Sequence, residues 1–336
     1  TDGSKVEAEN LAKVVNFKGI EKLTALKSLT LTNTQRNFKA LDLSENAALT
    51  FVDVSGCTNL ADLKLPETAA IETLLLRKTA ITAVDVSKYT GLKVLNVSDT
   101  KLTALDVKAN TELETLALAN VKVAELDVKA NTKLRTLDAA NCGLTKIDVS
   151  ANTLLEDLDV SGNSLITLDL TGLTALTADK FKADNNKRNI GTVIDGEYDL
   201  KDLVAEGLVV DNMTITTEGV TRNKNVLTGV KGDVTYTYET GLETEGLDKV
   251  TFTLAPEKVT SFNFYVSANG SNPVVCETWN DVLNAMNDKT VDYTVMIAKD
   301  NVKVDALKFP TAAKAKSVTI SSNNRDALTI ITKSAS

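Results

Sequence analysis

The most regular set of side chains that could do chemistry is a series of aspartates. Five recur at intervals of 21 residues and one lies earlier in the chain, which gives Asp42, Asp85, Asp106, Asp127, Asp148 and Asp169. Carboxylate oxygens are ligands for Ca²⁺, so a stacked column of them could form a cation-binding strip. A short carboxylate beside a turn can instead accept backbone N–H bonds, with water screening the repulsion between neighbours. We favour this structural role, and the calcium strip is the alternative.

The other chemistry available to the chain is narrow. Histidine is absent, which removes the commonest general base and metal ligand. Cys57, Cys142 and Cys276 have neither the number nor the spacing of a disulfide framework or a zinc site, so we expect buried free thiols. Neither a G-x-S-x-G nucleophile turn nor a phosphate-binding glycine loop occurs. We therefore expect a protein without catalytic residues, cofactor or metal site.

These side chains are carried by a repeat of 21 residues. The clearest unit, LETLALANVKVAELDVKANTK, spans residues 113–133, and apolar residues occupy positions 1, 4, 6, 11, 14 and 16. The aligned units begin at Leu26, Leu49, Ile71, Leu92, Leu113, Leu134, Leu155 and Leu176. The spacing 4–6, repeated at 14–16, places two side chains on one face of an extended segment. Each coil therefore has two short strands, whose apolar side chains are buried only when coils stack into a solenoid.

Departures from the repeat mark its ends. Residues 1–25 are less regular and are expected to form an N-terminal cap. Asp179 occupies position 4 of the last unit, where an unpaired carboxylate could not be buried at reasonable cost. The solenoid should therefore span residues 26–188 and end within the polar stretch 183–189. Within it, Cys57 and Cys142 both occupy position 9, four coils or ~19 Å apart, which is too far for a disulfide.

The LxxLxL…LxxLDL spacing resembles that of the leucine-rich-repeat family, and in particular the short 21-residue class of bacterial surface proteins, internalin-like or adhesin-like. The resemblance covers residues 16–186, about half of the chain. It implies a mainly β solenoid of short two-strand coils, a secreted or cell-surface location in bacteria, and a role in binding rather than catalysis. It also implies that the aspartates at position 15 and the asparagines at positions 8, 9 and 19 belong to the framework.

The outward positions of the first strand carry the candidate binding site. Positions 3 and 5 hold mostly small polar residues, but Phe51, Leu75 and Val94 form an apolar patch near the N-terminal end, with Arg77 beside it. Exposed apolar patches often mark contact sites, and Arg is common among interface hot spots. We therefore predict partner binding at Phe51, Leu75, Arg77 and Val94. The alternative is that the N-terminal cap or a loop covers these side chains.

Beyond residue 190 the repeat is lost. Short alternating runs at 213–215, 234–240 and 248–255 predict antiparallel strands, so residues 189–256 should form a small antiparallel β-domain. This order is similar to the β-domain that often follows such solenoids.

Residues 257–336 should form a β-rich segment with one short helix. Trp279, Val282, Leu283 and Met286 lie at helical spacing and predict a helix at 278–288, with Thr278 as its cap. Strand-like runs follow at 292–299, 302–309, 316–322 and 327–333, with a break at Pro310. The segment resembles the first coils of a right-handed β-helix, and the chain may be expected to come from a longer protein.

Composition narrows the class of partner. The net charge is −8 with dispersed acidic residues and no basic patch, which argues against a nucleic-acid partner. The longest apolar run is too short to span a membrane. We expect a monomer that binds an unknown protein or other macromolecule of a host or bacterial surface. The alternative is a structural stalk that extends a larger adhesin and has no ligand of its own.

Overall fold

The computed structural model describes residues 5–9, 17–32, 38–123, 125–194, 196–260, 264–268, 274–276, 279–286, 292–297 and 317–322. The chain is mainly β and groups by its contacts into two units. The first comprises residues 1–190, 200–225 and 233–255, and the second comprises residues 191–199, 226–232 and 256–336. Residues 200–225 and 233–255 thus group with the solenoid, and the domain boundaries expected from the sequence remain predictions.

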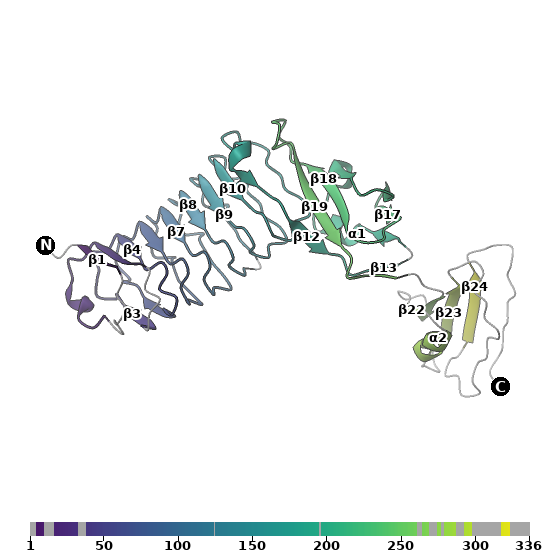
Figure 1. The fold of residues 1–336 in the computed structure, drawn as a ribbon, viewed down its shortest axis with the longest axis horizontal. Coiled ribbons are helices and arrows are strands. Elements are labelled where there is room, and N and C mark those ends of the chain that lie inside the picture. The colour runs from purple at the N-terminus through teal and green to yellow at the C-terminus, as the bar shows by residue number, and fades with distance from the viewer. Residues whose placement is uncertain are drawn as a thin grey trace. The chain divides into compact units, whose positions relative to one another are not determined.

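Stacked coils make up most of the first unit. Positions 3–5 of each coil form a short strand, and these strands lie side by side along one wall of the stack (Figure 1). They are β2 (Ser28–Thr32), β4 (Phe51–Asp53), β6 (Thr73–Leu75), β7 (Val94–Asn96), β8 (Thr115–Ala117), β9 (Thr136–Asp138) and β10 (Asp157–Asp159). With β1 (Lys5–Glu9) and β11 (Phe181–Lys182) at the edges they form a nine-stranded sheet, whose paired strands are all parallel.

The register of this sheet confirms the repeat alignment. Position 4 pairs with position 4 at every step, through Leu29, Val52, Leu74, Leu95, Leu116, Leu137 and Leu158. All seven side chains are fully buried, so they form one apolar ladder along the stack. The coils of 23 and 22 residues keep this register because their extra residues lie outside the strand.

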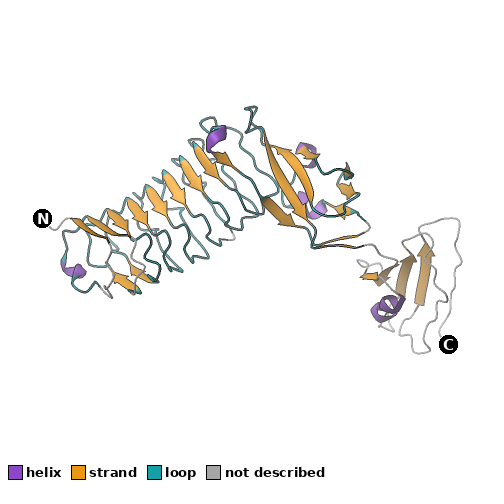
Figure 2. Ribbon diagram, viewed as in Figure 1, coloured by secondary structure: helices purple, strands orange, loops and turns teal. Residues whose placement is uncertain are grey.

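The opposite wall of the stack differs from the two-strand coil expected from the sequence (Figure 2). Positions 11, 14 and 16 are buried there as predicted, for example Leu102, Leu105 and Val107. Among the described coils, however, only β3 (Ala40–Asp42) and β5 (Asp62–Lys64) pair as strands on this wall. Later coils use the N–H at position 17 for a turn within the coil, and bonds between coils fall at position 10, as from Lys101 N to Ile81 O (3.0 Å).

The last coil is two residues longer than predicted. Asp179 is exposed and lies in a short 3-10 helix, Ala178–Lys180, and Phe181 instead pairs with Leu158. Asn186 then aligns with Asn163, and its Nδ2 donates to Val160 O (3.1 Å) in the preceding coil. The carboxylate is thus kept in water, as its desolvation cost requires, and the coil makes room for it by lengthening.

A four-stranded sheet follows the last coil in the same unit. Its order is β12 (Asn186–Asn189), β19 (Lys249–Ala255), β18 (Val234–Glu239) and β15 (Met213–Ile215). β18 is antiparallel to both β15 and β19, which confirms the predicted antiparallel strands, whereas β12 is parallel to β19. The unit also contains helix α1 (Lys201–Ala205), the 3-10 helices Ile20–Lys22 and Val210–Asn212, and β16 (Thr221–Asn223). Helix α1 was not predicted.

This sheet is joined to the final coils. Leu170 N donates to Thr240 O (2.8 Å), and the buried Tyr236 hydroxyl donates to Ile166 O (2.7 Å). Tyr236 packs against Phe252, with ring centroids 5.7 Å apart. Burial raises the pKa of the Tyr236 hydroxyl, so it stays a proton donor. The sheet therefore closes the C-terminal end of the apolar ladder.

The second unit contains short pairs of strands and one helix. β13 (Thr192–Ile194) is parallel to β20 (Lys258–Thr260), and β14 (Tyr198–Asp199) is antiparallel to β17 (Val226–Thr228). A further sheet has the order β22 (Val274–Cys276), β21 (Phe264–Ala268), β23 (Asp292–Ile297) and β24 (Ser317–Ser322). β23 and β24 are parallel, and their paired residues are 25 positions apart in the chain.

Helix α2 (Trp279–Ala285) confirms the helix predicted in this segment. Its Val282 is buried, as are Val266, Cys276 and Val295 of the strands. Thr278, Pro310 and the runs 302–309 and 327–333 lie outside the described residues.

Candidate functional site on the open strand face

The outward side chains of the strand wall form an open surface. On each strand from β4 to β10 except β5, the middle residue is buried and the two flanking residues are half-buried, because strand side chains alternate between faces. These flanking residues are the variable positions 3 and 5 of the repeat. Each column of the repeat thus becomes a row of neighbours, spaced ~4.8 Å apart.

The predicted site residues come together on this surface. Phe51 pairs with Thr73, and Thr73 pairs with Val94, so the two apolar side chains flank one threonine. Leu75 lies one position further along the same face of β6. Phe51, Leu75 and Val94 are half-buried and Arg77 is exposed. In the described part of the N-terminal segment, β1 pairs with β2 at the sheet edge, with Val6 opposite Leu29.

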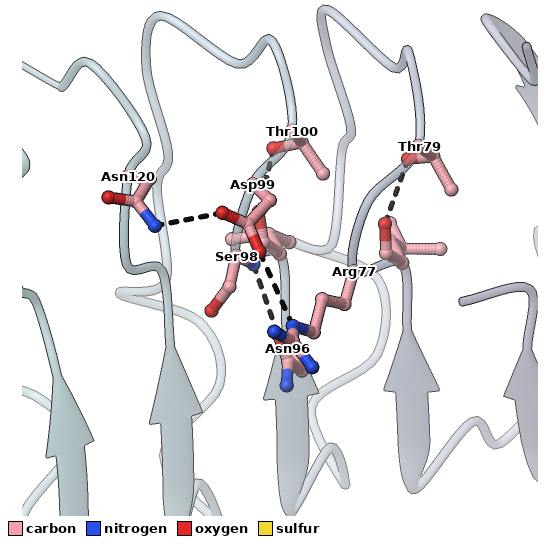
Figure 3. A network of polar contacts seen from close by, with 9 residues as sticks. Arg77, Thr79, Asn96, Ser98, Asp99, Thr100 and Asn120 are labelled. Carbon is pink, nitrogen blue, oxygen red and sulfur yellow. Dashed lines mark hydrogen bonds and ion pairs between the residues drawn. The ribbon is translucent and has the colours of Figure 1, made fainter. Parts of the chain in front are cut away.

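Arg77 is held in a polar network at the rim of this surface (Figure 3). Its Nε lies 3.4 Å from Asp99 Oδ2 in the next coil, and Asn120 Nδ2, one coil further, donates to Asp99 Oδ1 (2.8 Å). Asp99 and Asn120 occupy position 8, where the backbone is left-handed in every coil from β4 to β10, with φ between 56° and 77°. Aspartate and asparagine tolerate this conformation, which explains why they recur here.

The C-terminal end of the same surface is acidic. Asp138 pairs with Asp159 on the neighbouring strand, and Asp157 lies on the same face two residues before Asp159. Burial, followed by the charges of Asp159 and Asp157, raises the pKa of the Asp138 carboxyl, although a bond from Ala140 N opposes the shift. Asp159 is balanced by Lys182 at 3.5 Å. The strand face thus changes from apolar to acidic along the stack.

The aspartates of position 15 lie on the opposite wall and cap turns. All six accept the N–H of the residue two positions later, at 2.8–3.2 Å, which confirms the structural role favoured from the sequence. Lys64 replaces aspartate in one coil and pairs with Asp42 (3.1 Å). Lys129 likewise pairs with Asp148 in the next coil (2.9 Å). Among the described residues, no group of three or more acidic or thiol side chains is arranged to hold a metal ion.

The asparagine and cysteine positions serve the backbone. Asn46, Asn110, Asn131 and Asn152 are fully buried, and each Nδ2 donates to two carbonyls of the preceding coil or cap at 2.8–3.0 Å. At position 9, Cys57 and Cys142 donate their thiols to Leu31 O and Leu118 O, both at 3.1 Å. All three cysteines are free and buried, as predicted, and burial raises the pKa of Cys142 to about 11.

The stacked coils, the parallel strand wall and the asparagine ladder define the class of protein: a leucine-rich-repeat solenoid. No family model matches the chain, and no curated protein matches it.

Solved structures of the same fold are similar to the chain. Internalin C2 from Listeria monocytogenes is 23% identical over 54% of this chain and 80% of that one, with a TM-score of 0.46. The functional domain of InlJ from the same organism, which includes a cysteine ladder, is 18% identical over 76% and 81%, with a TM-score of 0.30. InlP from the same organism is 18% identical over 74% and 78%, with a TM-score of 0.36. The expected internalin-like resemblance is therefore also found among solved structures, as a likeness of fold.

Among the described residues, no helix combines the length and apolar character that crossing a bilayer requires.

Proposed function

We propose that the protein binds a protein partner through the open strand face, with Phe51, Leu75, Arg77 and Val94 as the contact residues. The observation that carries this proposal is the strand register, which gathers residues from three coils into one patch. Their neighbours on the face, such as Thr73, Asn96 and Thr115, are small and polar, so the patch is the part whose burial would contribute most to binding.

The chemistry of the patch suits a protein partner. Positions 4 and 6 are apolar because they fill the ladder, but the outward positions have no such packing requirement. Phe51 and Arg77 belong to residue types that are enriched in protein interfaces, where a few buried anchors supply most of the binding energy. A rigid parallel sheet also presents them with little conformational entropy to lose on association.

We further propose that the protein acts as a monomer on the surface of, or secreted from, a bacterial cell. A solenoid that serves only as a stalk is the competing function, and it predicts a strand face that can be substituted without loss. Binding and spacing therefore differ in whether the face has a ligand.

A pair of photo-cross-linking variants tests this proposal. A cross-linking residue at Thr73, between Phe51 and Val94, should capture a partner from bacterial or host surface fractions, whereas the same residue at Thr103, exposed on another side of the coil, should not. Phe51→Ala combined with Leu75→Ser should abolish the capture at Thr73 without lowering the melting temperature. The control is Leu154→Ser, which alters a 42% exposed leucine away from the face. Equal capture at both positions, or capture that survives the double substitution, would favour the stalk.

A further inference from the structure

Arg77 differs from the other cations of the strand wall in how it is held. Lys93 pairs with Glu72 at 3.0 Å, and Arg135 pairs with Glu156, in each case with an exposed carboxylate of a neighbouring coil. Arg77 instead contacts Asp99, whose side chain is 27% exposed against 52% for Arg77 itself. The carboxylate is therefore the more sheltered partner, and the guanidinium is the group presented to solvent.

The network leaves part of the guanidinium unused. Asp99 takes the Nε side of Arg77, and its second oxygen is occupied by Asn120 (Figure 3). Among the described residues, the two terminal nitrogens of Arg77 have no hydrogen-bond partner. These nitrogens are the edge of an arginine that can bind a carboxylate through two parallel hydrogen bonds.

The strand direction places this edge beside the apolar patch. Leu76 N donates to Asn96 O (2.7 Å) and Lys78 N donates to Ser98 O (3.0 Å), so the parallel ladder continues past the end of β6. Thr73, Leu75 and Arg77 follow each other at steps of two and share the outward face. Lys78 is also exposed and has no ion-pair partner among the described residues, so this rim carries two cations against one carboxylate.

We infer that the partner presents a carboxylate to Arg77, on a peptide segment that also inserts an aliphatic or aromatic side chain between Phe51, Leu75 and Val94. This inference rests on the proposed function, since it names the chemistry of the partner at the same face. Asp99 and Asn120 are positioning residues: they fix the guanidinium through its Nε and leave the terminal nitrogens to the ligand. Charge complementarity selects an acidic segment at this end of the stack, although the chain as a whole carries a net charge of −8.

A display library of random nonapeptides, selected on the full chain, tests this inference. The selected peptides should be enriched in Asp or Glu within a few residues of Phe, Leu or Trp. Arg77→Glu should reverse the enrichment towards Lys and Arg. Arg135→Glu is the matched control because its side chain is also 52% exposed and lies on the same wall, and it should leave the acidic preference intact.

A second measurement tests the role of the network. For one selected peptide, replacing its Asp by Asn should weaken binding to the parent protein about tenfold or more, as expected for loss of a charge-assisted pair. This ratio should fall to near one in Arg77→Ala, and to an intermediate value in Asn120→Ala. A residue with a purely structural role would change both affinities together and leave the ratio unchanged.

The outcomes separate this inference from the proposed function. Selection without charge preference, or acidic preference that survives Arg77→Glu, overturns the role of Arg77. If Phe51→Ala with Leu75→Ser still abolishes binding of those peptides, the strand face remains the binding surface and only the acidic partner is rejected. If that double variant also retains binding, both proposals fail.

Discussion

The same residue type, aspartate, does different work on the two walls of the coil. At position 15 a carboxylate closes a turn and faces a lysine or hydroxyl, as Asp148 does with Lys129 and Ser150. At position 5, Asp138 and Asp159 stand opposite each other on neighbouring strands, where like charges oppose each other. The first arrangement stabilises the charged form and the second disfavours it, although Asp138 also accepts a turn bond of the same kind.

Asp148 should report this difference by its titration. Hydrogen bonds from the Ser150 hydroxyl and from Lys129, followed by the Ser150 N–H, lower the pKa of Asp148 from its ordinary value of 3.8 to about 2. Because the folded-state pKa is the lower one, these bonds stabilise the fold fully above pH 3.8. Their contribution is lost as the pH falls from 3.8 towards 2. A carboxyl-detected NMR titration should place the midpoint of Asp148 near 2.

Ser150→Ala should raise the Asp148 midpoint towards 3.8 because it removes the largest cause of the shift. Asp85, which is capped by Ser87 in another coil, should keep its lowered pKa in that variant and serves as the internal control. A midpoint near 3.8 in the parent protein would contradict the turn geometry.

At the scale of the element, the sequence predicts the inner surface of a coil better than its outer walls. The spacing of apolar residues is a direct consequence of burial, so positions 4 and 6 and their register followed from it. The second strand did not, because hydrogen bonds between coils are sparse on that wall and no side-chain pattern reports them. Helix α1 was missed for a similar reason: it is five residues long, and its buried Leu200, Leu203 and Leu208 do not make a full helical period.

The candidate site was predictable in part. Phe51, Leu75 and Val94 stood out as apolar residues at outward positions, and the period of the repeat sufficed to place them together. The contact of Arg77 with Asp99 and Asn120 could not be read from the spacing, because it depends on side-chain directions across three coils. The signal that could have revealed it is the recurrence of Asp and Asn at position 8, where a left-handed backbone is required.

Leu126 tests the packing of one coil. It occupies position 14 and is 8% exposed, so Leu126→Ala should lower the free energy of unfolding by ~2–5 kcal/mol through lost burial and a residual cavity. Leu154→Ala makes the same chemical change at a 42% exposed position and should alter stability by less than about 0.5 kcal/mol. Chemical denaturation of both variants measures the difference. Equal stability of the two would mean that position 14 does not belong to the ladder.

At the scale of the whole first unit, the C-terminal end of the ladder is tied to the following sheet by side chains as well as strands. Arg188 is central because its side chain is only 12% exposed. Its Nε donates to Ser164 O (2.9 Å) and one terminal nitrogen to Thr145 O (3.0 Å). The other terminal nitrogen contacts Glu206 Oε2 at 2.5 Å, next to helix α1. One guanidinium thus joins two coils and the residues that cover them.

Arg188→Ala should therefore lower the free energy of unfolding by about 2–3 kcal/mol, since it leaves sheltered carbonyls without a charged donor. The neighbouring Lys187→Ala removes an exposed ion pair with Asp233 and should cost less than about 1 kcal/mol. Hydrogen exchange should show faster opening of β18 and β19 in the Arg188 variant only. Unchanged exchange in these strands would show that Arg188 is not needed to hold the sheet on the coils.

The constant register of the coils has a consequence for the history of the gene. Each inner coil contacts the coil before it and the coil after it in the same way, so an in-frame duplication or loss of one 21-residue unit, such as 113–133, restores equivalent neighbours on both sides. Such an event leaves both the patch at Phe51 and the closing sheet at Tyr236 unaltered and changes only the length of the stack between them. Recombination can therefore adjust the reach of this molecule in whole coils while its binding chemistry stays the same.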